Sequence, residues 1–299
     1  ALGRLEDPAL VGALTHHLED PEAIVRAEAA NALAQAVHHG DGKPVLDALL
    51  TRIESENDEQ VLGTFARTLG RLSLGDEDQS LALDILLELG DVGAAQVSPN
   101  LAQGLVLGLE ALARKSGGDL LSDQAKDQLV IMLRYRSADE LTAARVRALA
   151  LSTLRHAGAL TERYIEESLR DADPDVRRIA AASLDLMPPS LRTEFTRRAL
   201  GDQALRVSIE ALRQLADDPS NALRCQWLDI AAGETNMRPI RVLALEALGE
   251  QCPDVAAQQQ TLLDAVSEIG ATIDSEWLAP ARALVSLASI APELAEGVL

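Results

Sequence analysis

Two pairs of adjacent histidines near the N-terminus are the residues best suited to hold a metal ion. His16 and His17 end one apolar stretch of helical length, and His38 and His39 follow the next. Neighbouring residues on a helix point in different directions, so one pair alone cannot readily chelate a metal. One histidine from each pair could do so if the helices pack side by side, but zinc requires a third or fourth ligand, and none is evident. We therefore favour solvated histidines, and a metal site is the alternative.

Two short acidic runs carry the oxygen atoms that calcium prefers, but not at the required spacing. They cover residues 54–59 and 76–78. Neither run has the spaced oxygen ligands, the central glycine and the distal glutamate of an EF-hand loop. We interpret both as solvated acidic turns.

The chain has two cysteines, Cys225 and Cys252, which lie 27 residues apart. Cys225 belongs to an apolar stretch, whereas Cys252 directly precedes a proline. We favour two isolated thiols, and a disulfide between adjacent structural units is the alternative. No Asn-x-Ser/Thr sequence suggests secretion. The compartment stays open, with the cytoplasm preferred.

The sequence offers no motif of catalysis or of cofactor binding. It lacks a glycine-rich phosphate loop and the motifs His-Glu-x-x-His, Cys-x-x-Cys and Gly-x-Ser-x-Gly. We therefore predict a protein that is not an enzyme and that needs no cofactor.

Acidic residues dominate the chain of 299 residues: 47 Asp and Glu stand against 27 Lys and Arg, and the formal net charge is −20. Nucleic-acid binding draws much of its affinity from phosphate neutralisation by cations, so this balance argues against a nucleic-acid partner. An anionic membrane surface is disfavoured for the same reason. No apolar stretch is long enough to insert across a bilayer. A protein partner is compatible with the charge.

The elements that position these side chains follow from a nine-residue pattern that recurs eight times. Each copy ends in a leucine, with a small residue directly before it and a mostly apolar residue eight positions earlier. The eight leucines are Leu33, Leu69, Leu112, Leu154, Leu184, Leu212, Leu248 and Leu287. These positions fall on one face of an α-helix, where a small residue lets a neighbouring helix approach closely. The chain is therefore a tandem array of one helical unit.

Each unit is predicted to be a pair of helices. The second helices carry the pattern and are expected at residues 22–35, 60–72, 100–113, 143–156, 175–186, 203–215, 238–249 and 279–290. The first helices are the apolar stretches between them, expected at 9–18, 45–53, 80–89, 124–135, 162–169, 190–200, 221–231 and 255–269. Aromatic residues make up only 2% of the chain, which suits stacked short helices better than β-sheets.

Two of the turns between paired helices carry a family resemblance. Residues 18–26 (LEDPEAIVR) and 169–177 (LRDADPDVR) resemble the inter-helix turn of HEAT repeats. The resemblance extends over nearly the whole chain and implies an all-α fold, a right-handed α-solenoid of about eight HEAT-like helix pairs. It implies little about function, because HEAT arrays serve as scaffolds, as adaptors and occasionally as enzymes.

The resemblance also implies a structural ladder. In HEAT repeats an aspartate of the turn and the arginine that opens the second helix form hydrogen bonds between neighbouring repeats. Asp20 with Arg26 and Asp171 with Arg177 match this pattern. Two further positions match only the arginine half: Arg147 and Arg241. The second and third units depart from the pattern, so the ladder is expected to be interrupted there.

Some HEAT-like proteins are DNA glycosylases that combine tryptophans, a carboxylate and basic residues on a concave surface. Arg224, Trp227 and Asp229 resemble such a set. However, Trp227 lies in the apolar string of a first helix, and the charge balance lacks a basic face, so we interpret it as a packing residue. Trp277 is likewise interpreted as a core or end-capping residue.

The second helices of such arrays line an inner groove, where partners usually bind. The basic groove candidates are Arg67, Arg71, Arg114, Arg155, His156 and Arg213. The acidic ones are Glu110, Asp185, Glu210, Glu246 and Glu250. A mixed groove of this kind suits an extended or helical polypeptide better than a polyanion.

We therefore predict a non-catalytic protein-binding scaffold or structural module, built as one continuous array over residues 1–299. The alternative is an accessory region of a larger multidomain enzyme, as in some bacterial proteins with similar arrays. The chain lacks an initiator methionine, and residues 1–5 reproduce the end of a second helix. We therefore expect a fragment of a longer protein whose flanking domains are further partners.

Overall fold

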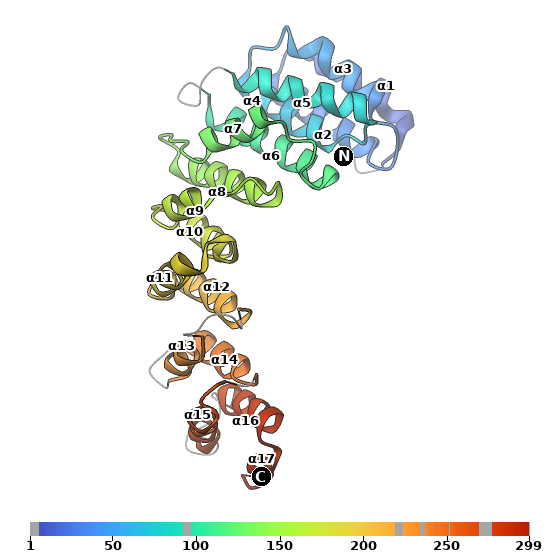
Figure 1. Cartoon of the computed structure of the whole chain (residues 1–299). Helices are drawn as coiled ribbons and strands as arrows, with labels where there is room; N and C mark the ends of the chain where they lie inside the picture. Colours follow the sequence, from blue (N-terminus) through green and yellow to red (C-terminus); the bar gives the residue numbers. More distant parts are fainter. Residues whose placement is uncertain are drawn as a thin grey trace. The chain divides into compact units, whose positions relative to one another are not determined.

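The computed structural model describes residues 6–91, 97–218, 224–233, 237–250, 252–268 and 277–298, and within these ranges it contains helices and no strand. The chain divides into two compact units, unit 1 (Ala1–Leu160) and unit 2 (Thr161–Leu299). The all-α solenoid class predicted from the sequence is confirmed, since successive helices of each unit pack in antiparallel pairs along the chain (Figure 1). The single continuous array over 1–299 stays a prediction, and residues 1–5 lie outside the described ranges.

Unit 1 holds the first four helix pairs. Its helices are α1 (Val11–His16), α2 (Ala23–Ala36), α3 (Lys43–Ile53), α4 (Glu59–Arg71), α5 (Asp76–Gly90), α6 (Pro99–Ser116), α7 (Asp123–Met132) and α8 (Glu140–His156). Short 3₁₀ turns, η2 (Pro8–Leu10) and η3 (His17–Glu19), flank α1, so the first predicted helix is split into three pieces. The even-numbered second helices pack against one another in order.

Unit 2 continues with shorter helices. They are α9 (Glu162–Ser168), α10 (Pro174–Ala181), α11 (Pro189–Leu200), α12 (Leu205–Ala216), α13 (Arg224–Ala232), α14 (Arg238–Ala247), α15 (Val255–Ser267), α16 (Leu278–Ile290) and α17 (Pro292–Glu296). The helix predicted at 175–186 ends early and continues as the 3₁₀ turn η4 (Leu184–Leu186). Pro188 and Pro189 follow that turn, and a proline disfavours helical geometry in the residue before it.

All eight pattern leucines are buried, at 1% exposure or less, so they pack the interface between helices as predicted. The small residue before the leucine also contacts the neighbouring second helix in two places. The Thr68 hydroxyl of α4 donates to the Ala30 carbonyl of α2 at 3.3 Å, and the Ser286 hydroxyl of α16 donates to the Glu246 carbonyl of α14 at 3.4 Å. A small polar side chain thus permits close helix packing and also satisfies a neighbouring carbonyl.

Local sequence signals set the helix ends that matter for the surface described below. Asp58 begins α4 by accepting hydrogen bonds from the Gln60 and Val61 amides, at 2.9 and 3.2 Å. The Ser98 hydroxyl accepts from the Leu101 amide at the start of α6. Gly117 ends α6 in the left-handed conformation, with φ of +66°, which glycine adopts without steric cost. Across the described part of the chain, no helix combines the length and the apolar character needed to cross a bilayer.

Candidate functional site

The second helices of unit 1 form a row of which one side is covered by the first helices. α2 packs against α4, α4 against α6 and α6 against α8, while α1, α3, α5 and α7 each pack on their own partner. The other side carries the exposed and half-exposed polar residues of the row, which we call the second-helix face. Its polar residues include Asn31, Arg67, Arg71, Glu110, Arg114, Lys115, Arg155 and His156.

Glycines draw α4 and α6 together until their backbones touch. A Cβ on Gly104 would lie 2.0 Å from the carbonyl oxygen of Gly63, and one on Gly70 would lie 2.1 Å from that of Gly108. Real Cβ atoms do not approach an oxygen so closely, so these positions require glycine. Because both helices run in the same direction, the contact also places the end of α4 beside the second half of α6.

Three cations meet where these two helices end, and we call Arg67, Arg71 and Lys115 the basic cluster. Arg71 Nη1 donates to Asn31 Oδ1 of α2 at 3.1 Å, and Lys115 Nζ donates to the Leu72 carbonyl that ends α4. Burial, together with the positive charge of Arg67, lowers the pKa of Arg71. Burial, together with the charge of Arg71, lowers the pKa of Lys115. The shifts have the direction expected for like charges held close together.

The basic cluster has no carboxylate of its own. Within the described ranges, no Asp or Glu lies within ion-pair distance of any of its three side chains, although the chain has 47 acidic residues. Arg114, which directly precedes Lys115, shows the more usual arrangement: its Nη2 lies 2.7 Å from Glu110 Oε1. Three cations gathered without an anion form a surface suited to binding an anionic group.

The structure brings together only two of the six basic groove residues predicted from the sequence, Arg67 and Arg71. Arg155 and His156 end α8, where Arg155 is half-buried and His156 is exposed. Arg213 belongs to unit 2 and pairs with Glu210 at 3.4 Å. Lys115 was not predicted, because it lies one position beyond those assigned to the groove. Its place in the last turn of α6, next to Arg114, is the signal that could have indicated it.

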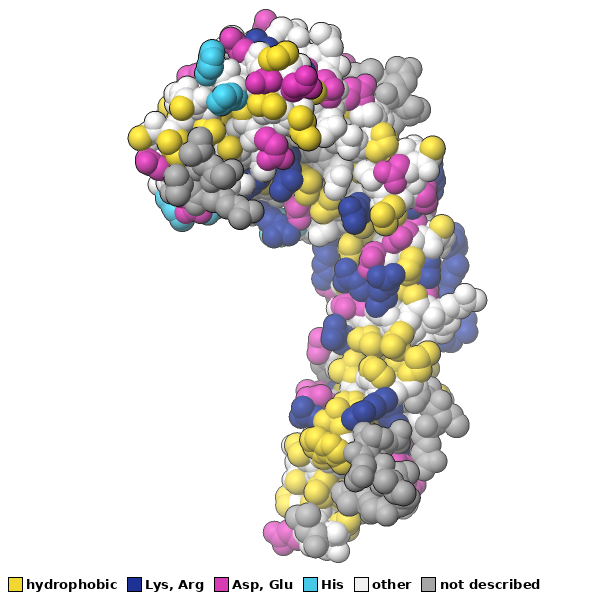
Figure 2. Space-filling model, turned by 180° about the vertical axis from the view of Figure 1, so that it is seen from behind, with side chains coloured by type: hydrophobic (Ala, Val, Ile, Leu, Met, Phe, Trp, Pro, Cys, Tyr) yellow, Lys and Arg dark blue, Asp and Glu magenta, His cyan; other side chains and the backbone are white. Residues whose placement is uncertain are grey.

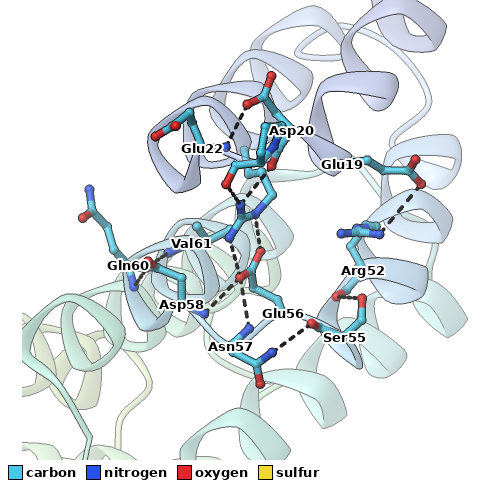
Figure 3. A network of polar contacts seen from close by, with 12 residues as sticks. Glu19, Asp20, Glu22, Arg52, Ser55, Glu56, Asn57, Asp58, Gln60 and Val61 are labelled. Carbon is cyan, nitrogen blue, oxygen red and sulfur yellow. Dashed lines mark hydrogen bonds and ion pairs between the residues drawn. The ribbon is translucent and has the colours of Figure 1, made fainter.

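The ladder arginine of unit 1 joins two helix pairs through a carboxylate that the sequence pattern did not indicate (Figure 3). Arg26 Nη1 donates to the carbonyls of Asp20 and Pro21, at 2.9 and 3.1 Å. Its Nε and Nη2 donate to both oxygens of Glu56, at 2.7 and 2.8 Å. The Asp20 carboxylate instead accepts from the Glu22 amide. The predicted partners thus meet through a carbonyl of the turn, while Glu56 forms the link to the next pair.

The ladder arginine of unit 2 repeats this geometry. Arg177 Nη1 donates to the carbonyls of Asp171 and Ala172, both at 2.9 Å. Its Nε and Nη2 donate to Asp202, at 2.7 and 2.9 Å. The guanidinium, with the Ala204 amide as a further donor, lowers the pKa of the Asp202 carboxyl. Each ladder arginine therefore fixes its own turn and also reaches the turn of the following pair.

The two arginines that match only half of the HEAT pattern are more deeply buried. Arg241 donates to the Ala232 carbonyl at 2.9 Å and to Glu268 at 2.8 Å, so it also reaches the next pair. Arg147 donates to the Tyr135 carbonyl at 3.2 Å and to Glu140 at 2.7 Å, within its own pair.

First helices of unit 2 contain similar arginines, which the HEAT pattern does not indicate. Arg192 binds Asp218 at 2.8 Å, and Arg224 binds Glu250 at 2.8 Å. In these two pairs and in the Arg26, Arg177 and Arg241 pairs, the carboxylate follows its arginine by 25 to 30 residues. This recurring distance is the signal that could have identified the acidic partners.

Polar hollows surround both ladder arginines, with volumes of about 540 Å³ at Arg26 and about 420 Å³ at Arg177. In each hollow the guanidinium is already bound to a carboxylate and to two carbonyls. The donors are therefore occupied, and we interpret both hollows as structural joints and not as ligand sites.

Cys225 and Cys252 form a disulfide, which corrects the interpretation of two isolated thiols. The bond joins α13 to the turn before α15, and thus links adjacent helix pairs of unit 2. A hollow of about 260 Å³ lies beside it. The favoured interpretation was wrong because the spacing of one repeat places both sulfurs at the same interface. Disulfides are typical of oxidising compartments, so the bond weakens the preference for the cytoplasm, which stays a prediction.

The other sequence candidates are dispersed. His16, His17, His38 and His39 are exposed, and His39 Nε2 lies 3.3 Å from Glu6. Within the described ranges, no group of three or more His, Cys, Asp or Glu is placed to hold a metal. Figure 2 shows the histidines near the N-terminal end of unit 1, and hydrophobic side chains exposed over the C-terminal helices of unit 2.

The two tryptophans lie in different environments. Trp227 packs against the core of unit 2, as predicted. Its neighbours serve other contacts, since Arg224 binds Glu250 and Asp229 accepts from the Thr261 hydroxyl. Trp277, which precedes α16, is 69% exposed and therefore does not lie in the core, and its interpretation as an end-capping residue stays a prediction.

Comparisons with known proteins give the fold and no family. No family model and no curated protein sequence matches the chain. The X-ray structure of YibA from Escherichia coli is similar over 93% of this chain and 91% of YibA, with a TM-score of 0.62 and 18% identity. A mutant of Kap121p, a HEAT-repeat karyopherin, is similar over 97% of this chain with a TM-score of 0.57 and 13% identity. This chain spans 34% of Kap121p. At such identities the likeness shows a helical-repeat fold alone.

Proposed function

We propose that this chain is a non-catalytic scaffold of HEAT type that binds a polypeptide through the second-helix face of unit 1. The observation that carries the proposal is the row α2, α4, α6 and α8, which presents the basic cluster on a face that no other described element of unit 1 covers. The ladder bonds of Arg26 and Arg177 and the likeness to Kap121p support the HEAT assignment.

The geometry of the row favours a polypeptide over a small molecule. Packed helices lie about 8–10 Å apart, so a row of them offers shallow parallel furrows in which an extended segment or a helix fits. The second-helix face mixes Arg67 and Arg71 with the Arg114–Glu110 pair. Such a mixture of charge and hydrogen-bonding groups is typical of a protein interface. An accessory role beside a catalytic domain outside this segment is the alternative, and no described contact favours it.

The test is selection of binders followed by charge reversal. The full chain is immobilised and exposed to a displayed library of unstructured peptides, and the enriched peptides are measured in solution by fluorescence anisotropy. Arg67→Glu and Arg114→Glu each place a negative charge on the second-helix face. Arg213→Glu is the matched control, because Arg213 is an exposed arginine of a second helix in unit 2 and, like Arg114, pairs with a glutamate on its own helix.

Peptides that bind as proposed lose affinity in both unit 1 variants and keep it in Arg213→Glu. Enrichment no greater than on an unrelated helical protein contradicts the proposal. Binding that survives both unit 1 reversals contradicts it as well, because the second-helix face would then not be the contact surface.

A further inference from the structure

Building on the proposed function, we propose that the basic cluster is a carboxylate-binding site, and that it takes an acidic segment of the partner polypeptide. The rest of the second-helix face would contact the backbone and neutral side chains of that segment. The basic cluster would fix the position of the acidic segment along α4 and α6.

The three cations of the cluster lie close enough for their charges to act on one another, and most of their donors stay available. Arg67 has no hydrogen-bond partner within the described ranges, and Arg71 uses one N–H for Asn31. Lys115 uses one for the Leu72 carbonyl. A guanidinium is a planar fork that binds both oxygens of a carboxylate, and an ammonium adds a compact charge beside it. Two guanidinium groups and one ammonium group thus suit a segment with neighbouring carboxylates.

The fold holds two of the three cations, Arg71 and Lys115, in place before any ligand arrives. The backbone contacts of Gly63 with Gly104 and of Gly70 with Gly108 fix α4 against α6. Asn31 then holds Arg71 from the side of α2, and the Leu72 carbonyl holds Lys115. Less conformational entropy is lost when a ligand meets groups that are already ordered. An anion also relieves the repulsion between the three positive charges.

Glu110, an acidic residue of this face, does not neutralise the cluster. Glu110 lies one helical turn before Arg114 and is paired with it, so its charge is already compensated. An acidic ligand therefore meets a locally positive surface, although the whole chain carries a formal charge of −20. Long polyanions extend beyond three cations and meet that negative field, and nucleic acids depend on many phosphate contacts. A short acidic peptide segment fits the cluster better.

The experiment measures the affinity of the full chain for defined probes by fluorescence anisotropy. The acidic probe is a labelled peptide of alternating glutamate and glycine. A peptide with glutamine in place of glutamate has the same length without the charge, and a single-stranded oligonucleotide supplies phosphates. Removing a charged hydrogen bond costs about tenfold in affinity or more. We expect the acidic probe to bind at least about tenfold more tightly than the glutamine probe.

The variants separate the cluster from general surface charge. Arg67→Gln and Arg71→Gln each remove one cation of the cluster, and each should weaken the acidic probe about tenfold. Arg67→Lys keeps the charge but loses the fork, so its loss should be smaller. Arg213→Gln removes the same charge from a second helix of unit 2, outside the second-helix face, and should leave the affinity within about threefold. Thermal unfolding followed by circular dichroism verifies that each variant is folded.

Three results would overturn the carboxylate site. They are equal binding of the glutamate and glutamine probes, an equal loss in Arg213→Gln and Arg67→Gln, and tighter binding of the oligonucleotide than of the acidic peptide. Failure of the carboxylate site can be distinguished from failure of the proposed function. Selected peptides that are not acidic but still respond to reversals on the second-helix face leave that function standing and remove the carboxylate site alone.

Discussion

The arginines beside the α4–α6 contact of unit 1 differ in role from the arginines at the joints of unit 2. In unit 2, Arg177 and Arg241 each bind a carboxylate of the following helix pair, whereas Arg192 and Arg224 each bind one in the turn that follows their own pair. Each of the four also binds at least one backbone carbonyl. In unit 1, the cluster residues Arg67 and Arg71 have no carboxylate within the described ranges. The role of a repeat arginine therefore depends on whether the next turn presents an acid, more than on its own position in the helix.

The kind of joint between helix pairs explains this difference, because the Arg26–Glu56 joint of unit 1 resembles those of unit 2, whereas the contact of α4 with α6 does not. Between α4 and α6 the joint is a backbone contact made by four glycines, and it needs no ion pair. In unit 2 the joints use arginine side chains, and one of them also has the disulfide of Cys225 and Cys252. Unit 1 can therefore leave cations at its surface without losing a structural link.

The largest expected effect comes from filling the glycine joint. Gly104→Val places side-chain atoms where a Cβ alone would lie 2.0 Å from the Gly63 carbonyl oxygen, so α4 and α6 must separate. We expect the free energy of unfolding to fall by about 4 kcal/mol. Gly12→Val is the matched control, because a Cβ on Gly12 meets nothing within 4 Å. Urea denaturation followed by circular dichroism measures both, and equal losses would contradict the glycine joint.

Removal of the disulfide should produce the next largest effect, this time in unit 2. The bond closes a loop of 27 residues, for which chain entropy predicts a stabilisation of about 3.5 kcal/mol. Both tryptophans of the chain, Trp227 and Trp277, lie in unit 2, so their fluorescence reports on this unit. Reductant should lower the urea midpoint of the fluorescence transition. The Cys225→Ser/Cys252→Ser variant should start at the lower midpoint and show no response to reductant.

The sequence predicts the packing of this molecule well, because packing depends on a local period. The eight pattern leucines need only the spacing of one helix face, and all are buried. Helix ends were predicted less well where a neighbouring residue interfered, as at Pro188 and Pro189 after α10. The periodicity of apolar residues predicts the central part of each helix, whereas single residues determine where the helix ends.

The candidate site and the joints were harder to predict from the sequence, because they depend on contacts between consecutive helix pairs. Asp20 could be assigned to Arg26 from the family resemblance, but Glu56 depends on the register between consecutive pairs. With 47 acidic residues in the chain, spacing alone does not select one. Lys115 joins the cluster only because glycines bring α6 against α4, and the disulfide forms only because two turns face each other.

Replacing one arginine of each role by alanine should give a smaller loss of stability, and one that differs clearly between the two residues. Arg241→Ala leaves Glu268 and the Ala232 carbonyl without a shared donor at a buried site. We expect a loss of about 2–3 kcal/mol in the free energy of unfolding. Arg67→Ala removes a side chain with no described partner, and should stay within about 0.5 kcal/mol of the parent. Comparable losses in urea denaturation would show that Arg67 is also a structural residue.

The smallest expected effect is the pH dependence of the stability that the two ladder bonds contribute. The bond to Arg177 lowers the pKa of Asp202, and the bond to Arg26 lowers the pKa of Glu56. A carboxyl with a lowered folded pKa stabilises the fold at neutral pH, and this contribution is lost as the pH falls from about 4 through the folded pKa. Asp202→Asn and Glu56→Gln should each lower the free energy of unfolding by about 2 kcal/mol at neutral pH.

The difference in this free energy between variant and parent should shrink below about pH 4, because the parent carboxyls are then protonated as well. A constant difference across this range would mean that the ladder bonds act through shape and not through charge. A difference that shrinks in only one variant would show that the two ladders, despite their common geometry, contribute unequally to the two units.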